Sequence, residues 1–293
     1  MANDLRNVPE GKQTYAMCLA SVKENWRQIK YVRKDCQTEE LCMLAIEQNA
    51  NALQYVQNQT SAICLAAVKQ DAWSLEYVKN QTPEICLEAV KHVPYTLKCV
   101  KDQTPEICLA AVKQNGCALE YVKNQTPEIC LAAVKQTGWA FEYVKEQTSE
   151  ICLEAVKQYA WMLQYIKAQT REICLEAVKQ NPLALDYVKD QTPEICLEAV
   201  KLNGHALIYV KDQTPEICLE AVKEDGTALR HIPKRKQILP IVIAALKQNP
   251  NSRAYLDDKF RTPEIYKVAG YDYKPEDLVP SQRSSKGART VRE

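Results

Sequence analysis

The chain repeats itself with a 22-residue period. Near-identical blocks, of the form Gln-Thr-Pro-Glu-Ile-Cys-Leu where complete, begin at Gln59, Gln81, Gln103, Gln125, Gln147, Gln169, Gln191 and Gln213. Self-similarity at a period of about 20–50 residues is typical of solenoids and other arrays, because one such unit cannot bury its apolar face alone. The period therefore predicts that folding belongs to the stacked array and that its two ends need caps.

The first half of each block predicts a helix. We number positions from the Thr of the block as position 0. Thr is a favourable N-cap, Pro at position 1 has the φ angle of a first helical residue, and Glu at position 2 meets the positive end of the helix dipole. Ile, Cys, Ala and Val at positions 3, 4, 7 and 8 share one face, widened by Leu at position 5. The pattern predicts an amphipathic helix of about three turns.

The second half of the block predicts a shorter helix after a bend. Asn-Gly at positions 11 and 12 is typical of the left-handed residue that ends many helices. Ala-Leu-Glu-Tyr-Val-Lys at positions 14 to 19 then carries an apolar stripe of Ala, Leu and Val. The sequence therefore predicts an all-α fold, an α-solenoid of stacked short helical hairpins with divergent terminal caps.

The organisation of the chain follows from how well each segment keeps the period. Residues 1–36 hold an N-terminal segment and a degenerate capping repeat, and residues 37–236 form the tandem 22-residue repeats. Residues 237–270 are predicted to be divergent C-terminal capping repeats, with a last helix that starts near Thr262 and stops at Gly270. Residues 271–293 lack the period and are expected to form a flexible tail. Capping helices with apolar outer faces would pair end to end, so the oligomeric state stays open.

Ten of the thirteen cysteines hold position 4 of successive repeats. Neighbouring rungs of such a ladder lie about 9–10 Å apart, too far for a disulfide and for a shared zinc ion. We therefore predict that the ten ladder cysteines are small buried hydrophobic side chains of a protein in a reducing cytosol. Cys36, Cys99 and Cys117 lie outside the ladder and are predicted to be isolated cysteines. The polar residues 1–12 contain neither a signal peptide nor a membrane span, so we expect a cytoplasmic protein without membrane contact.

No pattern in the sequence points to catalysis. The three histidines, His92, His205 and His231, lie in three different repeats, and no glycine-rich phosphate loop or nucleophile elbow occurs. The Glu residues at position 2 belong to a solvated helix face with Lys nearby. We therefore hypothesise that the chain is not an enzyme and binds neither a metal nor a cofactor.

Position 13 varies most between repeats, and what varies in a solenoid is free to recognise a partner. One interpretation is that its aromatic residues plug gaps between hairpins where Gly is missing; the other is an exposed aromatic row that anchors a partner. Aromatic residues at positions 13 and 17 share a helix face, which predicts the pairs Trp73/Tyr77, Trp139/Tyr143 and Trp161/Tyr165. The predicted partner-binding residues are Trp73, Tyr77, Tyr95, Trp139, Tyr143, Tyr159, Trp161, Tyr165 and His205.

The partner predicted first is a protein or peptide lying along a repeat surface, because stacked helix pairs commonly serve that role. A single-stranded nucleic acid read one unit per repeat is the alternative, and a small-molecule sponge a further one. Charge disfavours nucleic acid, since residues 37–212 carry a net charge of about −6 and only the ends are basic. A geometry that gathered the lysines on one face would favour it again.

The repeat resembles a known family. The unit QTPEICLEAVKQNGxALEYVKNQ, nearly complete as residues 191–212, is similar to the short helical repeats grouped as a domain of unknown function in bacteria and large DNA viruses. The resemblance covers residues 13–236 and implies a helical-repeat fold and a viral or intracellular-bacterial source. It brings no catalytic residues, and by analogy alone it suggests a host-interaction factor.

Overall fold

The computed structural model describes residues 4–270, and the predicted tail, 271–293, lies outside the described residues. The described residues form α-helices and short 3₁₀ helices joined by turns, without a strand in that range, which confirms the all-α prediction. No helix between residues 4 and 270 is long and apolar enough to cross a membrane. The chain divides into two compact units, Met1–Ala155 and Val156–Glu293, and the division falls inside α7 (Ser149–Gln158).

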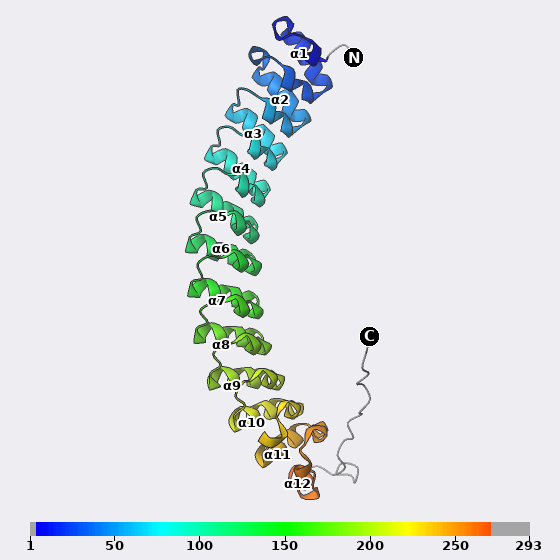
Figure 1. Cartoon of the computed structure of the whole chain (residues 1–293), viewed down its shortest axis with the longest axis vertical. Helices are drawn as coiled ribbons and strands as arrows, with labels where there is room; N and C mark the ends of the chain where they lie inside the picture. Colours follow the sequence, from blue (N-terminus) through cyan, green and yellow to red (C-terminus); the bar gives the residue numbers. More distant parts are fainter. Residues whose placement is uncertain (1–3, 271–293) are drawn as a thin grey trace, which may run out of the picture. The chain divides into compact units, whose positions relative to one another are not determined.

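In the first unit, short α-helices alternate with 3₁₀ helices and stack in sequence order (Figure 1). The α-helices are α1 (Tyr15–Glu24), α2 (Glu39–Gln48), α3 (Ser61–Gln70), α4 (Pro83–His92), α5 (Pro105–Gln114) and α6 (Pro127–Gln136). The 3₁₀ helices are η1 (Leu5–Asn7), η2 (Glu10–Lys12), η3 (Trp26–Tyr31), η4 (Lys34–Cys36), η5 (Ala50–Tyr55), η6 (Ala72–Tyr77), η7 (Pro94–Cys99), η8 (Gly116–Tyr121) and η9 (Gly138–Tyr143).

The second unit follows the same alternation after the end of α7. Its α-helices are α8 (Arg171–Gln180), α9 (Pro193–Leu202), α10 (Pro215–Glu224), α11 (Leu239–Gln248) and α12 (Pro263–Val268). Its 3₁₀ helices are η10 (Ala160–Tyr165), η11 (Pro182–Tyr187), η12 (Gly204–Tyr209), η13 (Gly226–His231), η14 (Lys234–Lys236), η15 (Pro250–Tyr255) and η16 (Asp258–Phe260). In each unit the α-helices pack on one another in one layer and the 3₁₀ helices in a second.

The predicted helix start and buried face are both confirmed. The Thr104 hydroxyl accepts a hydrogen bond from the N–H of Ile107 at 3.4 Å, and the same N-cap recurs in most repeats. Residues at positions 3, 4, 7 and 8 are almost fully buried, and the ladder cysteines are at most 3% exposed. All thirteen cysteines are free thiols. Burial raises the pKa of the ladder thiols, to about 11 at Cys42, Cys152 and Cys218, as expected for small apolar core residues.

The prediction of a left-handed Asn-Gly bend is wrong. Asn115 is extended, with φ −148° and ψ 113°, and the only positive φ of a glycine in residues 4–270 is at Gly270. Glycine serves close packing instead. A Cβ built on Gly116 would lie 2.3 Å from the carbonyl oxygen of Ala133 in the next α-helix. Helix pairs that follow a Gly at position 12 accordingly approach more closely than pairs that follow Ala or Pro.

The second helix is also different from the prediction. It is a 3₁₀ helix over positions 12 to 17, two residues earlier than expected, and it ends before the buried Val at position 18. The tighter 3₁₀ winding suits a segment of six residues, which is too short for a stable α-helix. Its start is fixed by the Asn115 side chain, whose Oδ1 accepts a hydrogen bond from the N–H of Cys117 at 3.0 Å.

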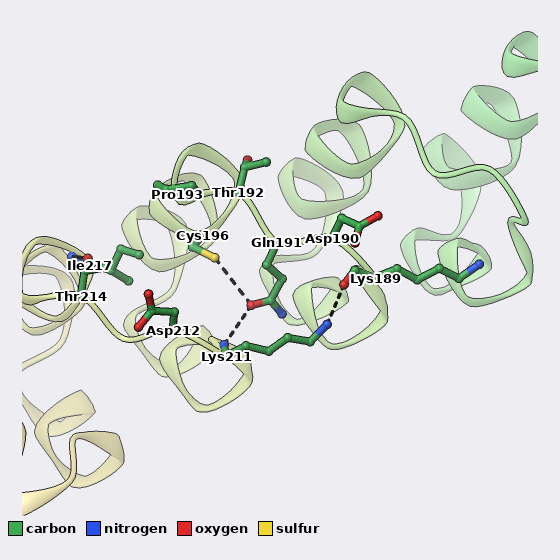
Figure 2. Close-up of a pocket in the computed structure, with 10 residues that line it drawn as sticks. All are labelled: Lys189, Asp190, Gln191, Thr192, Pro193, Cys196, Lys211, Asp212, Thr214 and Ile217. Atoms are coloured by element: carbon green, nitrogen blue, oxygen red, sulfur yellow. Dashed lines mark hydrogen bonds between the residues drawn. The ribbon is translucent and has the colours of Figure 1, made fainter.

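The glutamine that precedes each Thr binds two repeats together. Gln103 Nε2 donates to the carbonyl of Leu97 in the preceding 3₁₀ helix (3.0 Å) and to that of Tyr121 in its own repeat (2.9 Å). Its Oε1 accepts from the N–H of Lys123 (2.9 Å) and from the Cys108 thiol (3.9 Å). Gln191 forms the same four bonds; those to Lys211 and Cys196 are drawn in Figure 2. We call the row formed by the glutamine before the Thr of each repeat the Gln ladder.

One rung of the Gln ladder lacks the hydrogen bond from position 19, because a proline stands there. Position 19 of the repeat that begins at Gln213 is Pro233, which has no backbone N–H. Gln213 therefore keeps its two donated bonds, to Leu207 and His231, while its Oε1 is buried without a donor. The next block begins at Gln237, two residues later than the period predicts, and the added residues form η14.

The two ends of the described chain depart from the regular repeat. The block after the first repeat begins at Gln37, also two residues late, and the added residues form η4. At the other end, α12 starts after Thr262 and stops before Gly270, whose φ of 72° is left-handed. Tyr266 occupies position 4 of α12, where the inner repeats have Cys, and is fully buried.

The packing role of Gly116 gives a direct test. Gly116→Ala would force α6 away and break the hydrogen bond from the Gly116 N–H to Gln136 Oε1 (2.6 Å). We expect the free energy of unfolding to fall by about 1–3 kcal/mol in a urea titration. Gly11→Ala is the matched control, because no atom lies within 4 Å of the added Cβ. Equal urea midpoints for the two variants would contradict the close-packing role.

The Gln ladder gives a second test. Gln103→Ala removes the donor for the carbonyls of Leu97 and Tyr121 and the acceptor for the Lys123 N–H. Partly buried backbone groups left without partners should lower the free energy of unfolding by about 2–3 kcal/mol. Gln114→Ala removes an exposed glutamine of the same repeat and should change it by less than about 0.5 kcal/mol. Two variants of equal stability would rule out a structural role for the ladder.

Candidate functional site

Position 13 is the second residue of each six-residue 3₁₀ helix, and its side chain is exposed or half-buried in every repeat. Where position 11 is Asp or Asn, its side chain fixes the backbone of position 13: Asp71 Oδ1 accepts a hydrogen bond from the N–H of Trp73 at 2.9 Å, and Asn181 Oδ1 accepts one from the N–H of Leu183 at 3.0 Å. Positions 16 and 17 lie one 3₁₀ turn further on and share the exposed side with position 13. We call the surface formed by positions 13, 16 and 17 the 3₁₀ face.

The predicted partner-binding residues divide by exposure. Trp73 is 37% exposed and Trp139 is 49% exposed, so neither is a core plug. Tyr159 and Tyr165 in the second unit are also exposed. The half-buried members of the predicted set are Tyr77, Tyr95, Tyr143, Trp161 and His205. The exposure of Trp73 and Trp139 argues against the plug interpretation for these two residues.

Aromatic contacts run within repeats and also between them. The predicted pair Trp161/Tyr165 is confirmed, with ring centroids 6.2 Å apart, and Tyr159 lies 5.8 Å from Trp161. The other two predicted pairs stay predictions. The sequence did not reveal that position 13 also meets position 17 of the next repeat, as in Tyr95–Tyr121 (6.0 Å, edge to face). An aromatic residue at position 13 of one block together with another at position 17 of the next is the signal that could have found this contact.

Cations of the chain itself lie on some of these rings. Lys98 Nζ, at position 16 of η7, lies 4.6 Å from the ring centroid of Trp73 in the preceding repeat. Lys30 Nζ lies 5.8 Å from the rings of both Tyr31 and Tyr55. Aromatic faces attract such cations because the ring quadrupole is negative at its centre.

Carboxylates take the place of lysine on η8 and η9. Glu120 and Glu142 occupy position 16 there, and both are exposed. The pKa of the Cys117 thiol is raised, first by burial and then by the negative charges of Glu120 and Glu142. The pKa of Tyr143 is raised by partial burial, by Glu120 and by other neighbours. Both carboxylates therefore lie close to the same small region.

His205 is held inside the chain's own polar network. Its Nε2 lies 3.0 Å from Asp225 Oδ2, and its Nδ1 lies 3.1 Å from His231 Nε2. Burial raises the pKa of Asp225, but hydrogen bonds from Thr227 and the charge of His205 outweigh burial and lower it. Burial and the neighbouring Arg230 lower the pKa of His231. Because Asp225 and His231 meet opposite nitrogens of His205, the three side chains do not converge on one point.

The lysines at position 19 have a structural use. Lys123 Nζ donates to the carbonyls of Val100 (3.2 Å) and Lys101 (3.0 Å) in the preceding repeat. Lys211 Nζ makes the equivalent bonds to Val188 and Lys189, the second of which is visible in Figure 2. This lysine row therefore has a structural explanation that needs no phosphate ligand.

A shallow pocket of about 340 Å³ lies between α9 and α10, lined by residues of both repeats (Figure 2). Gln191 and Lys211 contribute to its wall, but their polar atoms are already bonded to backbone and to Cys196. Within residues 4–270, no group of three or more His, Cys, Asp or Glu side chains is placed to hold a metal ion. The 3₁₀ face is therefore the stronger candidate site.

One comparison with known proteins gives a match. The family model described as "Domain of unknown function (DUF4116)" matches residues 82–126, 104–148, 126–169, 148–192 and 192–235. Each matched segment spans two consecutive repeats. Neither the curated proteins nor the solved structures contain a match to the chain.

Proposed function

The chain belongs to the DUF4116 family, whose description assigns no function, and we propose that it is a non-enzymatic scaffold that binds an extended segment of a protein partner through its 3₁₀ face. One observation carries the proposal. Between residues 37 and 236, eight large apolar side chains are exposed, and seven of them belong to a 3₁₀ helix or to the residue that caps it. The seven are Trp73, Trp139, Tyr159, Tyr165, Leu183, Tyr187 and Ile208, and the exception is Leu202 in α9.

Exposed aromatic and aliphatic residues that are concentrated on one type of element, as they are between residues 37 and 236, fit a binding surface. Trp and Tyr supply much of the energy of protein interfaces, and a scatter of exposed apolar residues would not follow one element. The α-helices instead expose charged residues such as Glu106 and Lys113. Each unit carries such a surface, which supports recognition of a partner by either one.

The chemistry of the cysteines supports a role without catalysis. A nucleophilic cysteine needs a lowered pKa, because the thiolate is the reactive form. The pKa of the half-buried thiols of Cys99 and Cys117 is raised instead, by burial and by nearby carboxylates. The proposed scaffold therefore recognises its partner and leaves it chemically unchanged.

Selection from a displayed library of random twelve-residue peptides tests the scaffold function. We expect the full chain to enrich peptides, and Trp73→Ala/Trp139→Ala to lower the binding of those held by the first unit by about tenfold or more. Peptides held by the second unit should respond in the same way to Leu183→Ala/Ile208→Ala.

Leu202→Ala is the matched control, since it removes an exposed apolar side chain outside the 3₁₀ face. It should leave binding unchanged, and all variants should unfold at nearly the wild-type temperature because the altered residues are exposed. Absence of enriched peptides, or enriched peptides that bind both face variants as well as they bind wild type, would contradict the proposed function.

A further inference from the structure

The 3₁₀ face of the first unit has a distinct chemistry over η7 to η9. Aromatic rings of Tyr95, Tyr121 and Tyr143 lie at positions 13 and 17, and the carboxylates of Glu120 and Glu142 lie at position 16. None of the ion pairs found among residues 4–270 uses either carboxylate. Two exposed carboxylates beside aromatic rings attract a cation and repel an acidic group.

The Tyr95 ring of this region is held in place before any partner arrives. Tyr95 packs edge to face on Tyr121, and the Tyr95 hydroxyl accepts a hydrogen bond from Asn115 Nδ2 at 3.1 Å. The same Asn115 caps η8 through its Oδ1. A ring fixed at both its face and its hydroxyl loses little freedom on binding, which favours affinity.

The neighbouring repeats show which ligand such rings accept. On the 3₁₀ face from η5 to η9, Lys98 is the one basic residue at positions 13, 16 and 17, and it lies over the ring of Trp73. Lys30 lies over Tyr31 and Tyr55 in the same manner. At Glu120 and Glu142 the chain has carboxylates but no cation of its own beside the rings. A cation bound there therefore has to come from the partner.

Resting on the scaffold function above, we propose that the η7–η9 section of the 3₁₀ face binds an extended partner segment that carries two arginine or lysine side chains three residues apart. The spacing follows from the repeat. Glu120 and Glu142 hold the same position in successive repeats, and packed helices lie about 8–10 Å apart. A partner segment in the extended polyproline II conformation has three residues per turn and rises about 3.1 Å per residue, so side chains three residues apart lie on one side of it and match that distance.

The peptide library tests this partner class with variants that change only charge. Wild type should enrich peptides that carry two basic residues at a spacing of three, and Glu120→Gln/Glu142→Gln should lose this enrichment. Glu106→Gln/Glu128→Gln is the matched control, because it removes the same charge from the same two repeats on the exposed first turns of α5 and α6. It should keep the enrichment.

Two further measurements sharpen the test. The most enriched peptide, labelled with fluorescein, should bind about tenfold more weakly when citrulline replaces its arginines, because citrulline keeps the shape and loses the charge. Glu120→Lys/Glu142→Lys should enrich peptides with paired acidic residues instead.

The outcomes separate this inference from the scaffold function. Enriched peptides that depend on Trp139 but lack paired basic residues would overturn the inference and leave the scaffold function standing. An equal loss in Glu106→Gln/Glu128→Gln would also overturn the inference, since net charge alone would then explain binding. Absence of any enriched peptide would overturn both.

Discussion

The stacking of this chain depends on a single side chain repeated along it, the glutamine before each Thr. A 3₁₀ helix that ends after six residues leaves carbonyl groups without partners, and the next repeat has to satisfy them. Gln103 does so for the preceding repeat and for its own at once, by donating to Leu97 and Tyr121 while accepting from Lys123. Because its bonds join three segments, a single repeat cannot complete them, and order in one repeat requires the next.

The lysine at position 19 adds further hydrogen bonds between neighbouring repeats. Because the Gln ladder and this lysine row hold the repeats together, the residues of the 3₁₀ face are free to vary. Lys123 binds carbonyls of the preceding repeat through its ammonium group, so a residue that looks like a surface charge in the sequence is a structural contact. Positions 13 and 16 take no part in these bonds. They can therefore change from Trp73 to Leu183, or from Lys98 to Glu120, without altering the hairpin.

The sequence predicted features that lie within one repeat and missed the contacts between neighbouring repeats. The helix start at Thr104 and the buried face follow from capping and periodicity within ten residues, and both are confirmed. The 3₁₀ form of the second helix was not predicted, because in so short a segment the apolar residues fit the turn of a 3₁₀ helix and that of an α-helix equally well. The role of Gly116 depends on the carbonyl of Ala133, and the meeting of His205 with His231 depends on a neighbouring repeat. Pattern reading within one block cannot supply such contacts.

Amide hydrogen exchange at Lys123 tests the central claim most directly. Its side chain is exposed and its N–H lies in a turn, but that N–H donates to Gln103 Oε1. If the Gln ladder joins the repeats, this amide should exchange as slowly as the helical amide of Val112 in the buried face of α5. Exchange of the Lys123 amide at the rate of an unstructured peptide, while Val112 stays protected, would contradict the claim.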